Sequence, residues 1–172
     1  MHRSGAYVLA FTVASLLAGG HPLVADTGDK EHNELAKAMS AAKVALGSGL
    51  SAAAGIGKPI SAKYEVEGGK LLLSVYTEKD GQFSEVVVDH VTGKVAKSEA
   101  ITDGEDLSHA KGQSEAMAKA KLSLSAAVSK AVSANAGYEV TSVFPSLKDG
   151  HPVAEVSMHR GAEWRSATEK LE

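Results

Sequence analysis

In this 172-residue chain, the seven histidines and one turn that ends in glycine are the features that could take part in catalysis or ligand binding. Imidazole acts as a general base or a metal ligand near neutral pH. No two of the seven histidines have the i, i+4 spacing of a helical zinc site, and no His-Glu-x-x-His motif occurs. We therefore predict that the histidines lie in solvated loops and that the chain has no metal site.

Calcium binding and hydrolysis also lack their motifs. The acidic string Asp103-Gly104-Glu105-Asp106 could attract calcium, but the twelve-residue ligand register of an EF-hand is missing. The chain has no Gly-x-Ser-x-Gly motif, no cysteine and no phosphate-binding glycine loop. The sequence thus predicts neither an enzyme nor a cofactor, and we interpret the acidic string as a solvated linker.

The turn at Asp89-His90-Val91-Thr92-Gly93 is the most specific motif in the chain. An aspartate at the start of a turn accepts hydrogen bonds from backbone N–H groups, and a glycine at its end supplies a positive φ. Asp89, Thr92 and Gly93 are therefore predicted to be structural, with a ligand-binding site as the alternative.

The composition sets limits on the elements that hold this turn. Hydrophobic residues make up 44% of the chain but aromatic residues only 5%, so each core must consist of alanine, valine and leucine. A formal net charge of −3 argues against nucleic-acid binding, which requires a basic surface. The absence of cysteine rules out disulfide bonds, thiolate zinc sites and a lipid-anchored cysteine.

Residues 1–25 have the order of a secretory signal peptide. His2 and Arg3 precede an apolar run over 6–18, and the segment ends on the small residue Ala25. We predict cleavage near Ala25, a periplasmic or secreted protein, and no stable membrane insertion afterwards. An uncleaved N-terminal anchor is the alternative, although the apolar run is shorter than the ~20 residues that a spanning helix needs.

Hydrophobic periodicity predicts an α+β fold with two tandem units, each one helix packed on a three-stranded antiparallel meander. After a flexible segment at 26–33, the first unit (34–97) has one helical stripe from Glu34 to Ala53. It then alternates with period two, with turns at Gly68-Gly69 and Lys79-Asp80-Gly81. A polar linker (98–113) is expected to lead into the second unit.

The second unit (114–172) repeats this pattern. A helical stripe runs from Met117 to Ala131, and strands follow with turns at Asp149-Gly150 and Gly161. The two helices superpose at an offset of 78 positions, with Leu46 on Leu124. We interpret this as a duplication by pattern, with few identical residues.

The helix at 41–54, the hairpin at 60–77 and the string Val86-Val87-Val88-Asp89-His90-Val91-Thr92-Gly93-Lys94-Val95 resemble the PepSY domain family. The second unit matches in pattern but has His159-Arg160-Gly161 in place of the Asp and Thr-Gly turn. The resemblance implies a helix-and-meander fold, export, and a role in binding or inhibiting peptidases.

The sequence and this resemblance together favour an exported, non-enzymatic binding module. An exported peptidase or another envelope protein is the expected partner. It would add to an edge strand at 70–77 or 163–171, with Tyr76 and Trp164 as contact residues. The alternative is an envelope sensor or a module that binds a small ligand or a metal.

Overall fold

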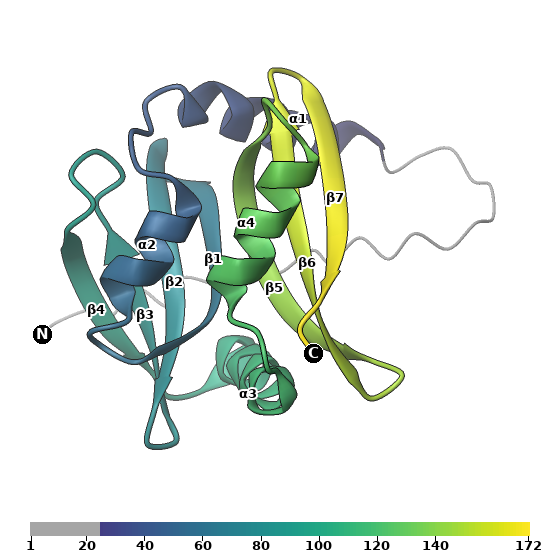
Figure 1. Ribbon diagram of the computed structural model, residues 1–172. Helices are drawn as coiled ribbons and strands as arrows, with labels where there is room; N and C mark the ends of the chain where they lie inside the picture. The colour runs from purple at the N-terminus through teal and green to yellow at the C-terminus, as the bar shows by residue number, and fades with distance from the viewer. Residues whose placement is uncertain (1–24) are drawn as a thin grey trace, which may run out of the picture.

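The computed structural model describes residues 25–172 and shows an α+β fold in which four helices accompany one seven-stranded antiparallel sheet (Figure 1). The helices are α1 (Ala25–Met39), α2 (Leu46–Ala53), α3 (Gly104–Lys119) and α4 (Leu124–Ala134). The strands are β1 (Lys58–Glu67), β2 (Lys70–Lys79), β3 (Gln82–Val88), β4 (Val95–Ile101), β5 (Glu139–Lys148), β6 (His151–Arg160) and β7 (Glu163–Lys170). The predicted signal peptide, apart from Ala25, lies outside the described residues. Among the residues that are described, no helix is long and apolar enough to cross a membrane.

Strands from both halves of the chain join in a single sheet. Its order is β4-β3-β2-β1-β5-β6-β7, so the first strands of the two meanders are neighbours at the centre. β1 and β5 pair over a short stretch, Ala62 with Val143 and Lys63 with Ser142. The first half contributes four strands to this sheet where we had predicted three, because β4 adds to the outer side of β3.

The hairpin turns lie where the sequence placed them. β1 and β2 are joined by Gly68-Gly69, and β2 and β3 by Asp80-Gly81. Both residues of the second turn have positive φ, 53° and 77°, which is the backbone of a type I′ turn. This turn matches the right-handed twist of the strands it joins, and Asp-Gly is one of its preferred sequences. Asp149-Gly150 makes the corresponding turn between β5 and β6, with φ of 52° and 81°.

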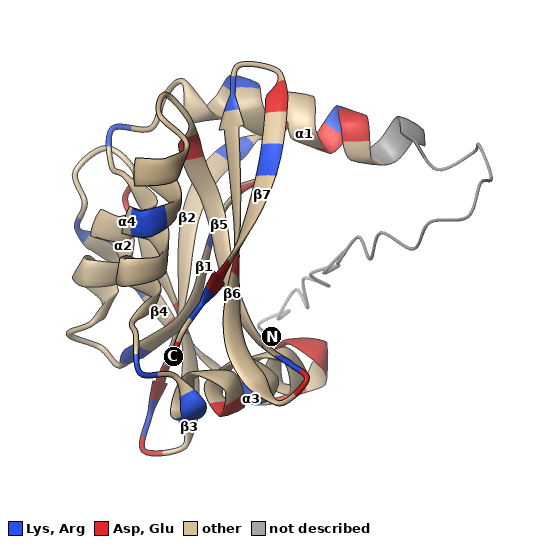
Figure 2. Cartoon of the chain, turned by 45° about the vertical axis from the view of Figure 1, so that its right-hand side comes forward, with Lys and Arg blue, Asp and Glu red and all other residues tan. Residues whose placement is uncertain are grey.

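The core lies between one face of the sheet and helices α2 and α4. Figure 2 shows these two helices side by side against that face, while α1 and α3 lie at opposite ends of the strands. Alternation along the strands sends their apolar residues to this face, and Leu73, Val75, Val86 and Val156 are fully buried there. The buried side chains of both halves form one continuous cluster, so the two sets of strands share a core.

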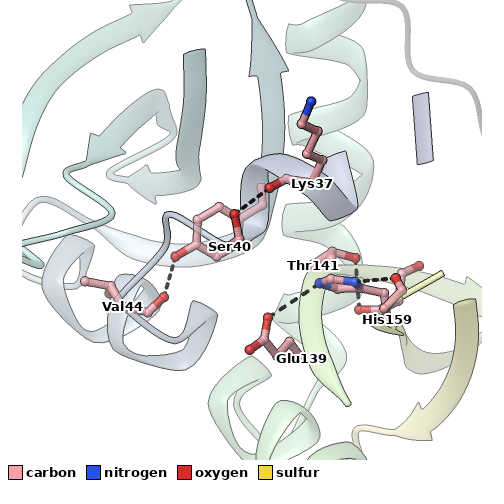
Figure 3. Close-up of polar contacts among 9 residues, drawn as sticks. Lys37, Ser40, Val44, Glu139, Thr141 and His159 are labelled. Carbon is pink, nitrogen blue, oxygen red and sulfur yellow. Dashed lines mark hydrogen bonds and ion pairs between the residues drawn. The ribbon is translucent and has the colours of Figure 1, made fainter. Parts of the chain in front are cut away.

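The helical stripe predicted from Glu34 to Ala53 is divided into two helices, which corrects that prediction. α1 ends at Met39, where the Ser40 hydroxyl donates to the Lys37 carbonyl (Figure 3). The backbone N–H groups of Lys43 and Val44 then donate to the His90 carbonyl at 2.8 and 3.1 Å. These tertiary bonds replace helical ones, so the chain bends between α1 and α2.

Residues 26–33, which we predicted to be flexible, belong to α1. The prediction failed because it rested on polarity alone. Only Lys30 and Glu31 of this segment are good helix formers, so the helix over 26–33 continues from the turns that follow it and not from local propensity. The anchor of α1 is its last turns, where Met39 is buried and Leu35 packs against the core.

The predicted linker at 98–113 is also wrong, because residues 98–101 belong to β4 and residues 104–113 to α3. The predicted second helix is divided as well: Met117 is in α3, and α4 begins at Leu124 after the N-cap Ser123. Between the two helices the N–H groups of Lys121 and Leu122 donate to the Leu171 carbonyl. Polar composition again failed to distinguish a linker from an exposed edge strand followed by a half-exposed helix.

Candidate functional site

A groove of about 530 Å³ lies on the face of the sheet turned away from α2 and α4. α1 forms one wall, with Glu31, His32 and Leu35, and strands β1, β5, β6 and β7 form the floor. Because side chains alternate along a strand, the floor carries the residues that the core does not use. These include four polar side chains on neighbouring strands: Lys63, Ser142, Ser157 and Ser166.

An ion pair lies in the floor of this groove. The Lys63 ammonium is 2.6 Å from the Glu65 carboxylate, and their side chains are 13% and 22% exposed. The Ser74 hydroxyl donates to the same carboxylate at 3.0 Å. The pair offers a positive and a negative group to a bound molecule, and both are held in place by neighbouring strands.

Trp164 forms the end of the groove on β7. Its indole stacks on the His32 ring of α1, with centroids 4.2 Å apart and planes 17° apart, and on the His159 ring at 5.3 Å. His159 is buried, and its Nε2 lies 3.5 Å from the Glu139 carboxylate (Figure 3). The three stacked rings connect α1 to the edge of the sheet. Trp164 itself is half-buried and lines the groove.

A second groove, of about 650 Å³, lies over β2, β3 and β4 beside the N-terminal end of α3. Its lining is charged and includes Glu85, Lys97, Glu99 and Asp106. Burial raises the pKa of the Glu85 carboxyl, and the nearby carboxylates of Glu65 and Asp106 act in the same direction. Within the described part of the chain, no three histidine or acidic side chains are grouped as a metal ion would require.

The turn from Asp89 to Gly93 is not part of the lining of either groove. The N–H groups of Val91 and Thr92 donate to Asp89 Oδ1 at 2.9 and 2.7 Å, and these bonds lower the pKa of Asp89. Gly93 has a φ of 73°, and its N–H donates to the Asp89 carbonyl at 2.8 Å. The same turn supplies the His90 carbonyl that holds the connection between α1 and α2. Its geometry is that of a structural turn.

Tyr76 is not at the surface, which corrects its prediction as a contact residue. Because side chains alternate along β2, Tyr76 lies on the other face of the strand from Leu73 and Val75, and we expected that face to be exposed to solvent. That face is covered there by α3, whose Gln113 bonds to Ser61, the cross-strand neighbour of Tyr76. The Tyr76 side chain is 3% exposed, and burial raises the pKa of its hydroxyl.

The two edges of the sheet are β4 and β7. β2, predicted as an edge, lies between β1 and β3, whereas β7 corresponds to the other strand predicted to receive a partner. The edge at β4 was missed because four of its seven residues, 98–101, were assigned to the linker. The groove was missed too, although Ser142, Ser157 and Ser166 are a signal for it. Each lies on the face of its strand that is opposite the apolar residues of the core, which indicates that this face has little apolar cover.

Comparison of the chain with protein-family models, with curated proteins and with solved structures gives no match.

Proposed function

We propose that this chain is an exported, non-enzymatic binding protein made of two PepSY-like units, and that it docks on an envelope protein, with an exported peptidase as the first candidate. The partner inserts an extended segment along β7 and places side chains in the groove that contains Trp164. The observation that carries the proposal is an edge strand that also lines a groove.

Equivalent positions in the two halves support the two-unit interpretation. The first residues of α2 and α4, Leu46 and Leu124, are 78 positions apart, as the sequence pattern predicts. The strands follow at a constant spacing of 81 positions: β1 with β5, β2 with β6, and β3 with β7. A β-bulge interrupts β1 between Pro59 and Ser61, and a bulge 81 positions later interrupts β5 between Val140 and Ser142.

The central pairing supports the same interpretation. Ala62 and Val143 are themselves 81 positions apart, and they pair with each other where β1 meets β5. This is the pairing that a twofold axis between Ala62 and Val143 produces, because only a residue at the axis faces its own equivalent across antiparallel strands. In this view β4 is an addition to the first unit, and each unit retains its helix and its three-stranded meander.

The β7 edge is suited to receive an extended segment. Its outer N–H and C=O groups have no neighbouring strand among the described residues, and an added strand satisfies them. Ser166 and Trp164 point from β7 into the groove and can contact alternate side chains of the added segment. The Lys63–Glu65 pair lies further along the same floor and can form ion pairs with charged side chains of the added segment.

Affinity capture from envelope extract tests this proposal. The exported protein should capture a peptidase and reduce its activity, while a Ser166→Arg variant should lose the capture because the larger side chain fills the groove. Ser129→Arg on the exposed face of α4 is the matched control and should capture as well as the wild type. Equal capture by the Ser166 variant, or no peptidase above background, would contradict the proposal.

The hydroxyl-rich floor favours one alternative, a module that binds a small polar ligand. Ser142, Ser157 and Ser166 lie beside the Lys63–Glu65 pair, and the indole Nε1 of Trp164 is buried without a hydrogen-bond partner among the described residues. Thermal denaturation in the presence of periplasmic amino acids, sugars and metal ions separates the two functions. A ligand raises the melting temperature of the wild type but not of Ser166→Arg, since it stabilises only the state it binds.

A further inference from the structure

The β4 edge is exposed along its whole length. Six of its seven residues are exposed and Ile101 is half-buried, and the strand has β3 on one side only (Figure 1). Proteins normally protect such an edge with a proline, a covering element or an unbalanced charge. β4 has no proline, and its single lysine is balanced by a single glutamate two positions later. Its register against β3 shifts at Ala96, near the start of the strand, so the regular and unprotected part of this edge is 97–101.

The sequence of β4 is complementary to itself when it is reversed. Ser98 is the central residue of Val95-Ala96-Lys97-Ser98-Glu99-Ala100-Ile101. When two copies are aligned antiparallel about Ser98, Lys97 faces Glu99, Ala96 faces Ala100, and Val95 faces Ile101. Opposite charges and apolar pairs that face each other across antiparallel strands are stabilising. The Lys97–Glu99 pairs beside the axis lie in the regular part of the strand and are thus favourable, and no like charges face each other at the outer positions.

We propose that β4 pairs antiparallel with β4 of a second copy of this chain, with the twofold axis at Ser98, so that the two sheets continue as one. Lys97 and Glu99 already form an ion pair within the strand at 2.8 Å, and their side chains are 58% and 60% exposed. In the dimer each lysine lies between two carboxylates, its own Glu99 and that of the second copy. Such an interface is isologous and closes at two subunits, which prevents further growth at this edge.

The β7 edge lacks this property. Pairing two copies about Ser166 opposes Glu163 to Glu169, which are like charges. Pairing about Ala167 opposes Arg165 to Glu169, but that carboxylate is buried against α4, 2.6 Å from the Lys130 ammonium. The two edges therefore differ, and the dimer leaves β7 free for the partner proposed above.

Dimerisation also changes the second groove. Lys97, Glu99 and Ile101 line that groove on β4, and a twofold axis perpendicular to the sheet keeps both copies' grooves on the same face. The two grooves then meet at the axis as one charged channel between the α3 helices of the two copies. The second copy thus contributes residues to a surface that is incomplete in one chain.

Charge reversal tests the register directly. Over a concentration series from micromolar to millimolar, analytical ultracentrifugation of the wild type should show a monomer–dimer equilibrium. Lys97→Glu and Glu99→Lys should each raise the dissociation constant about tenfold or more, because like charges then face each other. An equimolar mixture of the two variants should dimerise again, and so should the double variant, since both restore opposite charges.

A disulfide reports the position of the axis. The chain has no cysteine, so Ser98→Cys introduces a single thiol. Facing residues of antiparallel strands have Cα atoms about 4.5–5.5 Å apart, within the range of a disulfide, so mild oxidation should yield a covalent dimer. Thr168→Cys on β7 is the control and should remain monomeric.

A wild type that is monomeric at every concentration overturns the proposal. So do single charge variants that dimerise like the wild type, a mixture that stays monomeric, or a Ser98→Cys variant that does not cross-link. These results are independent of peptidase capture through β7, because no variant in this series alters the groove that contains Trp164.

Discussion

Replacing Val143 by alanine tests whether the two halves of the sheet unfold together. Val143 is fully buried at the centre of the sheet, where it pairs with Ala62 in the short stretch that joins β1 to β5. The substitution removes two methyl groups and leaves a cavity, which costs about 2 kcal/mol of unfolding free energy. In a chain of this size that corresponds to a fall in melting temperature of roughly 4–8 °C.

The assay follows urea unfolding with two signals. Fluorescence of Trp164, the only tryptophan, reports the second half of the chain, whereas far-ultraviolet circular dichroism reports helices and strands of both halves. Because the buried side chains form one cluster, both signals should change at the same midpoint, and Val143→Ala should shift both equally.

Val132→Ala is the matched control, because this valine lies on α4 and is 43% exposed. The same two methyl groups are removed there, but little buried area is lost and alanine is the better helix former, so stability should stay within about 0.5 kcal/mol. Midpoints that separate between the two signals, or a Val143→Ala shift in the fluorescence signal alone, would refute the shared core.

Three further predictions concern single positions. Gly49→Ala should lower the melting temperature, because its Cβ would lie 2.6 Å from Cδ2 of the buried Leu73, whereas Gly55→Ala meets nothing within 4 Å and should not. Glu85→Gln should raise the melting temperature at pH 7. The pKa of Glu85 is raised in the folded state, so the wild type loses stability as the pH rises above 4.5. The difference in melting temperature between the variant and the wild type should therefore vanish as the pH is lowered. Asp89→Ala should destabilise at pH 7 more than Asp89→Asn, which can still accept the turn N–H bonds. Since the folded-state pKa of Asp89 is lowered, this stabilisation is present above pH 3.8 and should be lost in acid denaturation below it.

The dimer and the proposed partner use opposite edges of one sheet, and this affects how capture experiments are read. A dimer joined at β4 presents two β7 edges at its two ends, so one dimer can bind two partner molecules. Capture stoichiometry measured with the wild type and with Lys97→Glu should therefore remain one partner per chain in both.

Short-range patterns in the sequence determined six of the seven strands, their hairpin turns and the Asp89–Gly93 turn, because alternation of side chains and the φ preferences of Asp and Gly act over a few residues. Long-range contacts decided the rest. Hydrogen bonds to the His90 and Leu171 carbonyls divide each predicted helix, and pairing with β3 turns a polar segment into β4. The cover of α3 buries Tyr76, and the pairing of β1 with β5 merges two meanders into one sheet with a groove across its back. Local periodicity contains no information about which distant backbone groups satisfy one another, so these features could only be read from the tertiary structure.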